Sequence, residues 1–329
     1  MIRFALLGCG RIGRVHAGAI AAHPRAQLAA CFDVDPAAAQ EVAAGHGAHV
    51  AGSVDEVLSD PAIGAVVIAS ATPTHVELLT RAAQAGKKVF CEKPIDLDLG
   101  RVDRCWAEIG GLSPLVMIGF NRRFDPSFQA LRRRLLAGEI GRLEQVVITS
   151  RDPRPPPPEY VRVSGGMFRD MTIHDFDMAR YLAGEIAEVF AAGANLVDPA
   201  IGEAGDFDAG MVVMRAASGA LVHVNNSRRC AYGYDQRVEV FGAAGMLHAG
   251  NRHDTTVEAW TAQGTHMADP VQDFFIERYA EAYRAEIDHF VGCIETGAAP
   301  LAGFADGRAA LALADAAVES ARTGRAVSL

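Results

Sequence analysis

Hydrophobic residues fall into continuous runs separated by helix-like segments through the first 120 residues. Apolar runs that favour strands lie at 2–8, 26–33, 63–70, 87–94 and 114–120. Helix-like segments lie at 14–24, 54–58, 72–86 and 96–110. Continuous apolar runs are typical of parallel strands covered on both faces, and intervening helices imply right-handed crossovers. The pattern predicts an α/β fold with a doubly wound parallel sheet.

The rest of the chain has a different pattern. Strand-like runs with short connections lie at 143–150, 188–197, 208–216, 220–229 and 235–250. They favour a large, open, mostly antiparallel sheet. Two helices are expected at the end, over 274–297 and 303–324, closed by Gly297 and Gly324. We therefore predict a Rossmann domain at 1–121 and an α+β domain at 122–329, with the last helices as candidates for packing back on the first.

Composition narrows the possible partners. The 329 residues carry 31 Lys and Arg against 40 Asp and Glu, a formal charge of −9, which argues against nucleic-acid and anionic-membrane partners. The 6 cysteines have no C-x-x-C spacing, so no metal site is expected. The chain enters a strand pattern at once and lacks a long apolar run, so we expect a cytoplasmic protein with reduced thiols.

A glycine motif follows the first strand. "GCGRIG" places Gly8, Gly10 and Gly13 in G-x-G-x-x-G spacing before a helix, and the second strand ends at Asp33. Such glycines allow close approach of a pyrophosphate, and the acid accepts hydrogen bonds from a ribose diol. Asp33 favours NAD over NADP, although the nearby Arg11 leaves that preference open. Ligands of such sheets bind beyond the carboxyl ends of the strands, where Ser70–Thr74, Glu92–Pro94 and Phe120–Arg123 also lie.

The stretch "GGMFRDMTIHDFDMARYLAG" (165–184) concentrates acids around one histidine. One interpretation is an amphipathic helix with a solvated acidic face. The other is a proton-transfer pair, because Asp170 and His174 lie on one face if the helix begins early enough. We expect Asp175 to be solvated, and Asp177 to have either a structural or a catalytic role.

The motif "CEKP" (91–94), together with "GCGRIG", "ATPTH" and the Asp170, His174, Asp177 spacing, resembles the Gfo/Idh/MocA family of NAD(P)-dependent oxidoreductases. The resemblance covers the whole chain. It implies that Lys93, Asp170 and His174 form the catalytic group. Three longer stretches, "GGMFRDMTIHDFDMARYL", "NSRRCAYGYDQRVEVFG" and "DFFIERYAEAYRAEIDHF", are most similar to bacterial inositol 2-dehydrogenases.

That resemblance implies NAD-dependent oxidation of myo-inositol to 2-keto-myo-inositol (scyllo-inosose). A neutral imidazole suits a base near neutral pH, a carboxylate can fix its tautomer, and a lysine favours the alkoxide-like transition state. Alternatives are another inositol isomer such as scyllo-inositol, or a pyranose. A non-catalytic dinucleotide-binding regulator is disfavoured because Lys93 and His174 are both present.

The expected ligand-binding residues form two sets. The cofactor set is Gly8, Gly10, Arg11, Ile12, Gly13, Asp33, Ser70, Thr72, Pro73, His75, Glu92 and Lys93. The substrate set is Lys93, Arg123, Asp152, Asp170, His174 and Tyr234. Arg123 could instead form a surface pair with Asp125, and Tyr234 could pack at the sheet rim. The proline-rich loop 153–158 is expected to be stiff and extended, and it leaves the contribution of Asp152 open. The expected partners are a small polyol and further copies of the chain, with a homotetramer favoured.

Overall fold

The computed structural model describes all 329 residues and divides them into two compact units. Unit 1 comprises 1–124 and 281–311, and unit 2 comprises 125–280 and 312–329. The last long helix, α13 (Phe304–Thr323), begins in unit 1 and ends in unit 2. No helix combines the length and apolar character needed to cross a membrane. All six cysteines are buried and free of disulfides.

Unit 1 is built on a six-stranded sheet in the order β3-β2-β1-β4-β5-β6, with every neighbouring pair parallel. The strands are β1 (Ile2–Leu7), β2 (Ala26–Phe32), β3 (His49–Val50), β4 (Ala65–Ile68), β5 (Lys88–Cys91) and β6 (Val116–Ile118). This order and the parallel pairing confirm the predicted doubly wound sheet. The central strand β4 is buried along its whole length, as its continuous apolar run predicts.

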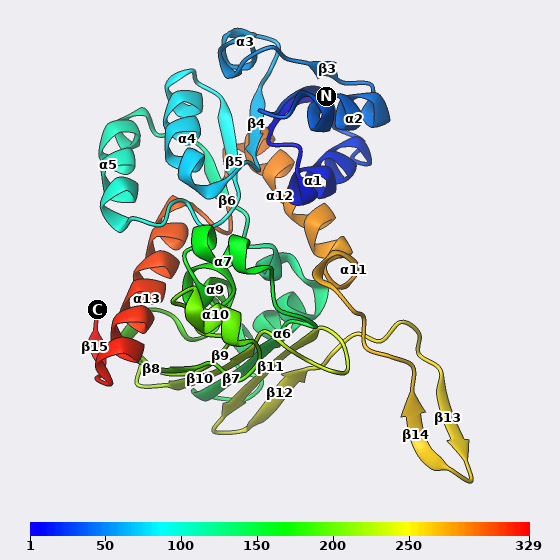
Figure 1. Ribbon diagram of the computed structural model, residues 1–329, viewed down its shortest axis with the longest axis vertical. Coiled ribbons are helices and arrows are strands. Elements are labelled where there is room, and N and C mark those ends of the chain that lie inside the picture. The colour runs from blue at the N-terminus through cyan, green and yellow to red at the C-terminus, as the bar shows by residue number, and fades with distance from the viewer. The chain divides into compact units, whose positions relative to one another are not determined.

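Helices cover both faces of this sheet, with α1 and α2 on one side and α4 and α5 on the other (Figure 1). The α-helices of unit 1 are α1 (Arg11–Ala21), α2 (Pro36–His46), α3 (Val54–Ser59), α4 (His75–Gln84), α5 (Leu99–Ile109) and α12 (Ala280–Thr296). Short 3₁₀ turns are η1 (Thr72–Thr74), η2 (Gly110–Leu112) and η3 (Asn121–Phe124). Phe290 of α12 packs against Phe4 and Phe90, so this late helix contributes to the core of unit 1.

Unit 2 contains a seven-stranded sheet in the order β12-β11-β7-β10-β9-β8-β15. Its strands are β7 (Leu143–Arg151), β8 (Ile186–Ala194), β9 (Ala209–Ala216), β10 (Leu221–Ser227), β11 (Asp235–Gly242), β12 (Gly245–Ala249) and β15 (Val327–Ser328). Neighbours are antiparallel except β7 and β10, which run parallel. The mostly antiparallel open sheet predicted for this part of the chain is therefore confirmed.

Unit 2 also contains several helices, most of which lie on one side of its sheet (Figure 1). They are α6 (Pro126–Leu136), α7 (Pro158–Ser164), α8 (Met167–Asp170), α9 (Ile173–Ala183), α10 (Pro199–Glu203), α11 (Phe275–Arg278) and the end of α13. A separate hairpin of β13 (Glu258–Thr261) and β14 (Gly264–Ala268) extends from unit 2 (Figure 1).

Two predicted helices are interrupted. The helix expected over 274–297 is two helices, because Tyr279 between them has φ −111° and ψ 17°, outside helical geometry. The helix expected within 165–184 is also divided, since α8 ends at Asp170 and α9 begins at Ile173. The proline-rich loop is followed directly by α7, whose first residue is Pro158.

Candidate active site

The glycine turn between β1 and α1 is closely packed on one side and open on the other. Gly8 has φ +102°, and a Cβ there would lie 2.4 Å from the backbone nitrogen of Ser70. A Cβ on Gly13 would lie 2.1 Å from the carbonyl oxygen of Gly8. A Cβ on Gly10 would meet nothing within 4 Å, so the turn is open where a pyrophosphate would approach.

Asp33 is held beside this turn. Its Oδ2 accepts the Cys9 backbone N–H at 2.6 Å, and its Oδ1 accepts that of Asp35 at 2.8 Å. Gly10 precedes α1 without a side-chain cap, which leaves the positive end of the helix for an anion. The open turn, the uncapped helix and the acid at the end of β2 together fit a dinucleotide.

The loops after β4 and β5 are joined by His75. Its Nδ1 lies 2.8 Å from the carbonyl oxygen of Pro94, and its Nε2 lies 3.0 Å from that of Ser70. The imidazole is 1% exposed, so it acts within the protein as a bridge between the two loops. Lys93 is half-buried, and its backbone N–H donates to Glu92 Oε2 at 3.2 Å. The assignment of these residues to cofactor binding stays a prediction.

Arg123 lies in η3 with its guanidinium buried. Nη1 donates to the Leu301 carbonyl at 2.6 Å, and Nη2 donates to Asp306 at 3.0 Å. The alternative of a surface pair with Asp125 is wrong, because Asp125 instead caps α6 and forms a buried ion pair with Arg278. The assignment of Arg123 to substrate binding stays a prediction.

In unit 2 the parallel strands β7 and β10 end at the same edge of the sheet. The Asp152 backbone N–H, just past β7, donates to the Ser227 carbonyl at 2.9 Å. Tyr234 immediately precedes β11, whose first residue Asp235 pairs with Arg151 of β7. Tyr234 is 6% exposed and lies edge-on to Tyr279. Asp152 and Tyr234 therefore belong to one edge, as the substrate set requires, although their contact with substrate stays a prediction.

Asp170 is the last residue of α8 and is held by two distant groups. Its Oδ1 accepts a hydrogen bond from the Tyr160 hydroxyl at 2.9 Å. Its Oδ2 faces both terminal nitrogens of Arg228 at 3.4 Å each. Because α8 and α9 are separate, Asp170 and His174 are not residues of one continuous helical face. That geometric expectation is wrong, while their shared catalytic role stays a prediction.

Arg228 was not identified from the sequence. It directly follows β10, its side chain is 2% exposed, and it also lies 3.8 Å from Asp206. Asp206 in turn accepts the Met167 backbone N–H that opens α8. The available signal in the sequence was the basic pair in "NNSRR", which directly follows a predicted strand.

The acids in α9 are buried. Asp175 is 0% exposed and accepts from the side-chain amide of Asn226 at 2.8 Å, and Asp177 is 1% exposed. Asn226 Oδ1 also accepts the Thr172 hydroxyl at 2.8 Å. The predicted solvation of Asp175 is wrong, and so is the interpretation of this helix as a solvated acidic face. Burial is possible because the amide from β10 satisfies the carboxylate.

Comparison with known proteins identifies the two domains of the chain and its relatives. Residues 2–120 match the oxidoreductase family NAD-binding Rossmann fold, and residues 128–248 match the GFO/IDH/MocA C-terminal domain. The chain is 49% identical to an inositol 2-dehydrogenase of Rhizobium meliloti, covering 100% of this chain and 99% of the relative. It is 45% identical to a myo-inositol 2-dehydrogenase of Thermotoga maritima, covering 100% of this chain and 98% of the relative.

A solved structure with ligands is also similar. The scyllo-inositol dehydrogenase of Lactobacillus casei with bound NAD(H) and scyllo-inositol has a TM-score of 0.92 and 30% identity. The match covers 100% of this chain and 99% of that one. These findings identify unit 1 as carrying an NAD-binding domain and the chain as an oxidoreductase.

Proposed function

The chain belongs to the Gfo/Idh/MocA family of NAD-binding oxidoreductases, and on that basis we propose that it oxidises myo-inositol to 2-keto-myo-inositol. The observation that carries this proposal is the full-length similarity, at 49% and 45% identity, to two proteins named as inositol 2-dehydrogenases. We further propose that the reaction takes place in the cytoplasm and serves inositol catabolism.

The proposed chemistry separates a hydride from a proton. NAD, when bound, accepts the hydride from the carbinol carbon. His174 takes the hydroxyl proton, and Asp170 orients the imidazole and stabilises its charged form. Lys93 stabilises negative charge on the hydroxyl oxygen as it develops. The contacts of Tyr160 and Arg228 with Asp170 support this division of roles, because they fix both oxygens of its carboxylate.

The polar groups at the edge of the unit 2 sheet support a polyol as the substrate. Asp152 and Tyr234 supply a carboxylate and a phenol there, and an inositol ring presents hydroxyls that bind to such groups. Scyllo-inositol is the second candidate, because the ligand-bound relative carries that isomer. A pyranose is the third candidate.

The deciding experiment measures NADH formation with myo-inositol, scyllo-inositol, other inositol isomers and aldoses. We expect kcat/KM to be highest for myo-inositol. Turnover with aldoses alone would overturn the inositol assignment but not the family. Lys93→Ala should lower kcat by ~10²-fold or more, far more than it weakens NAD binding, as expected for a group that acts mainly in the transition state. Near-normal kcat in that variant would remove Lys93 from the mechanism.

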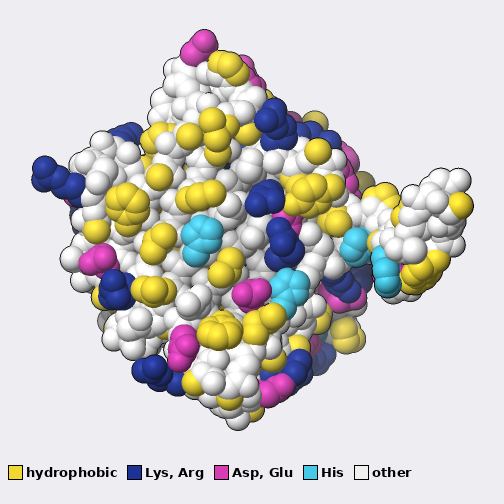
Figure 2. Space-filling view, turned by 90° about the horizontal axis from the view of Figure 1, so that it is seen from below, with side chains coloured by type: hydrophobic (Ala, Val, Ile, Leu, Met, Phe, Trp, Pro, Cys, Tyr) yellow, Lys and Arg dark blue, Asp and Glu magenta, His cyan; other side chains and the backbone are white.

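We also propose that the chain forms a homotetramer through the outer face of the unit 2 sheet. Alternate residues of its strands put apolar side chains on that face: Phe190, Met211, Val213, Leu221, Phe241 and Met246, each 42% to 55% exposed. Figure 2 views the molecule from this side and shows hydrophobic groups spread among polar ones. Apolar area of this kind usually marks a protein interface. Light scattering should give four copies, and Met211→Lys with Phe241→Lys should give smaller species; a monomeric parent protein would contradict the proposal.

A further inference from the structure

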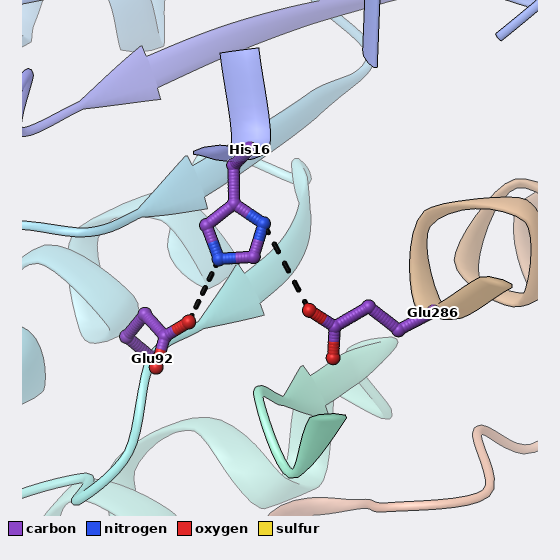
Figure 3. Close-up of side chains that lie close together, drawn as sticks. All are labelled: His16, Glu92 and Glu286. Carbon is purple, nitrogen blue, oxygen red and sulfur yellow. Dashed lines mark hydrogen bonds and ion pairs between the residues drawn. The ribbon is translucent and has the colours of Figure 1, made fainter. Parts of the chain in front are cut away.

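Three buried titratable side chains come together in unit 1 (Figure 3). His16 is on α1, Glu92 directly follows β5, and Glu286 is on α12. His16 and Glu286 are 0% exposed, and Glu92 is 7% exposed. Titratable side chains are rarely buried, because the removal of a charged group from water costs free energy.

The imidazole lies between the two carboxyl groups (Figure 3). His16 Nε2 is 2.7 Å from Glu92 Oε1, and Nδ1 is 3.9 Å from Glu286 Oε1. A metal ion would bind one ring nitrogen and draw both carboxylates to that side. Here each carboxyl group faces a different nitrogen, so the arrangement is a line of contacts rather than a cage for a cation.

This line ends at the backbone of Lys93. Glu92 uses Oε1 for His16, and its other oxygen accepts the Lys93 backbone N–H at 3.2 Å. The Glu92 carboxyl group is also confined by Gly119, because a Cβ there would lie 3.0 Å from Oε1 and 3.1 Å from Oε2. The Glu92 carboxyl group therefore links His16 to the Lys93 backbone.

We propose that His16 and Glu286 are positioning residues, which act through Glu92 to place Lys93 for the oxidation step. The proposal rests on the catalytic role of Lys93 given above. Because His16 is on α1, which begins at the glycine turn, the same side chain connects the cofactor-binding turn to the lysine. Neither residue touches substrate or cofactor in this role.

The protonation state of Glu286 favours the His16 tautomer in which Nε2 donates to Glu92. Burial, and to a smaller extent the negative charge of Glu92, raises the pKa of Glu286 well above its ordinary value, so that it holds a proton. The atom of His16 that faces Glu286 is Nδ1, at 3.9 Å, which is too long for a hydrogen bond. A neutral carboxyl group beside Nδ1 does not compete with Glu92 for the ring hydrogen, so Nε2 can carry the hydrogen that is donated to Glu92. Glu286 thus favours the tautomer that holds Glu92 in place.

The test compares variants that keep a donor with variants that lack one. His16→Leu removes the donor to Glu92, and Glu286→Met removes the polar group beside Nδ1; each should lower kcat by about tenfold, less than the ~10²-fold that a 1 Å displacement can cost. The Kd for NAD, from titration calorimetry, should stay within about twofold. His16→Gln and Glu286→Gln keep an N–H at a similar place and should recover most of kcat. If the Leu variant does not fold, Gly119→Ala displaces the Glu92 carboxyl group without removing any member and should also lower kcat.

A matched control variant changes an ion pair that also connects α12 with the end of α1. Asp288 is on α12 two residues from Glu286, and it pairs with His23, just beyond α1, at 3.0 Å on the surface. Asp288→Asn should leave kcat unchanged. Unchanged kcat in His16→Leu and Glu286→Met, or an equal loss in Asp288→Asn, would overturn the positioning role. If Lys93→Ala retains normal kcat, the catalytic role of Lys93 is wrong. That result is distinguishable from a failure of the positioning role of His16 and Glu286.

Discussion

Replacing Arg228 by Met should destabilise unit 2 strongly, because it leaves two mostly buried carboxylates without their counter-charge. The Asp170 and Asp206 side chains are 14% and 12% exposed, and they lie 3.4 and 3.8 Å from the guanidinium. At an effective dielectric constant of about 20, one pair at 3.4 Å has a gross attraction of about 5 kcal/mol. Desolvation of the guanidinium offsets part of this, so we expect a loss of about 3–5 kcal/mol, the usual cost of breaking a buried pair.

The assay is denaturant unfolding of the parent protein and of four variants: Arg228→Met, Asp170→Asn, the double variant and Arg228→Lys. Asp170→Asn in the Arg228→Met background removes one of the uncompensated charges, so the double variant should be more stable than Arg228→Met alone. Arg228→Lys keeps the charge and should lose less stability, although a lysine cannot contact Asp170 through two nitrogens. A loss below about 1 kcal/mol in Arg228→Met, or strict additivity in the double variant, would refute this reasoning.

Three further predictions concern the cofactor, the proton-transfer pair and pH. Asp33→Ala should weaken NAD binding and narrow the preference for NAD over NADP. A KM for NADP lower than that for NAD in the parent protein would contradict the role of this acid. His174→Ala and Asp170→Ala should each reduce kcat severely, and the double variant should lose little more, whereas additive losses would mean that they do not act together. The raised pKa of Glu286 means that the folded state holds a proton which the unfolded chain releases above about pH 4.5, so stability falls as pH rises. Glu286→Gln should remove this contribution, which amounts to about 1.4 kcal/mol per pH unit between about pH 4.5 and the folded pKa; equal pH slopes in urea unfolding of both proteins would argue against a protonated Glu286.

The architecture of unit 1 could be predicted because its signals are local. Buried parallel strands have continuous apolar runs, and the glycine motif specifies its own turn through contacts at Gly8 and Gly13. The mostly antiparallel sheet of unit 2 was also predictable, since buried and exposed residues alternate along strands such as β9.

Other features depend on packing that the sequence pattern does not report. The interruption at Tyr279 occurs inside a run with good helical spacing. The hairpin of β13 and β14 has mostly exposed residues and therefore lacks the buried face that identifies a strand. Asp175 was expected to be solvated because its amide partner, Asn226, is 51 residues away in the chain.

The residues that orient the candidate catalytic groups were the least predictable. Arg228 and Asp170 are 58 residues apart, and His16 and Glu92 are 76 apart. A charged side chain in an amphipathic helix or after a strand is usually solvated. The sequence position of each of these residues, taken alone, therefore predicts an exposed side chain. Only the fold shows that their charges meet inside the protein.

Glu286 illustrates why such a buried group is better explained by function than by stability. Both of its carboxyl oxygens lack a hydrogen-bond partner within normal distance, and Nδ1 of His16 is 3.9 Å away. An apolar side chain of similar volume at this position would avoid that desolvation, and replacing buried ionisable groups in this way is often neutral or stabilising. Glu286→Met should therefore melt at an equal or higher temperature than the parent protein at pH 8 while its kcat falls. A variant that gains stability and loses turnover would separate positioning from folding, because a purely structural role predicts that both decline together.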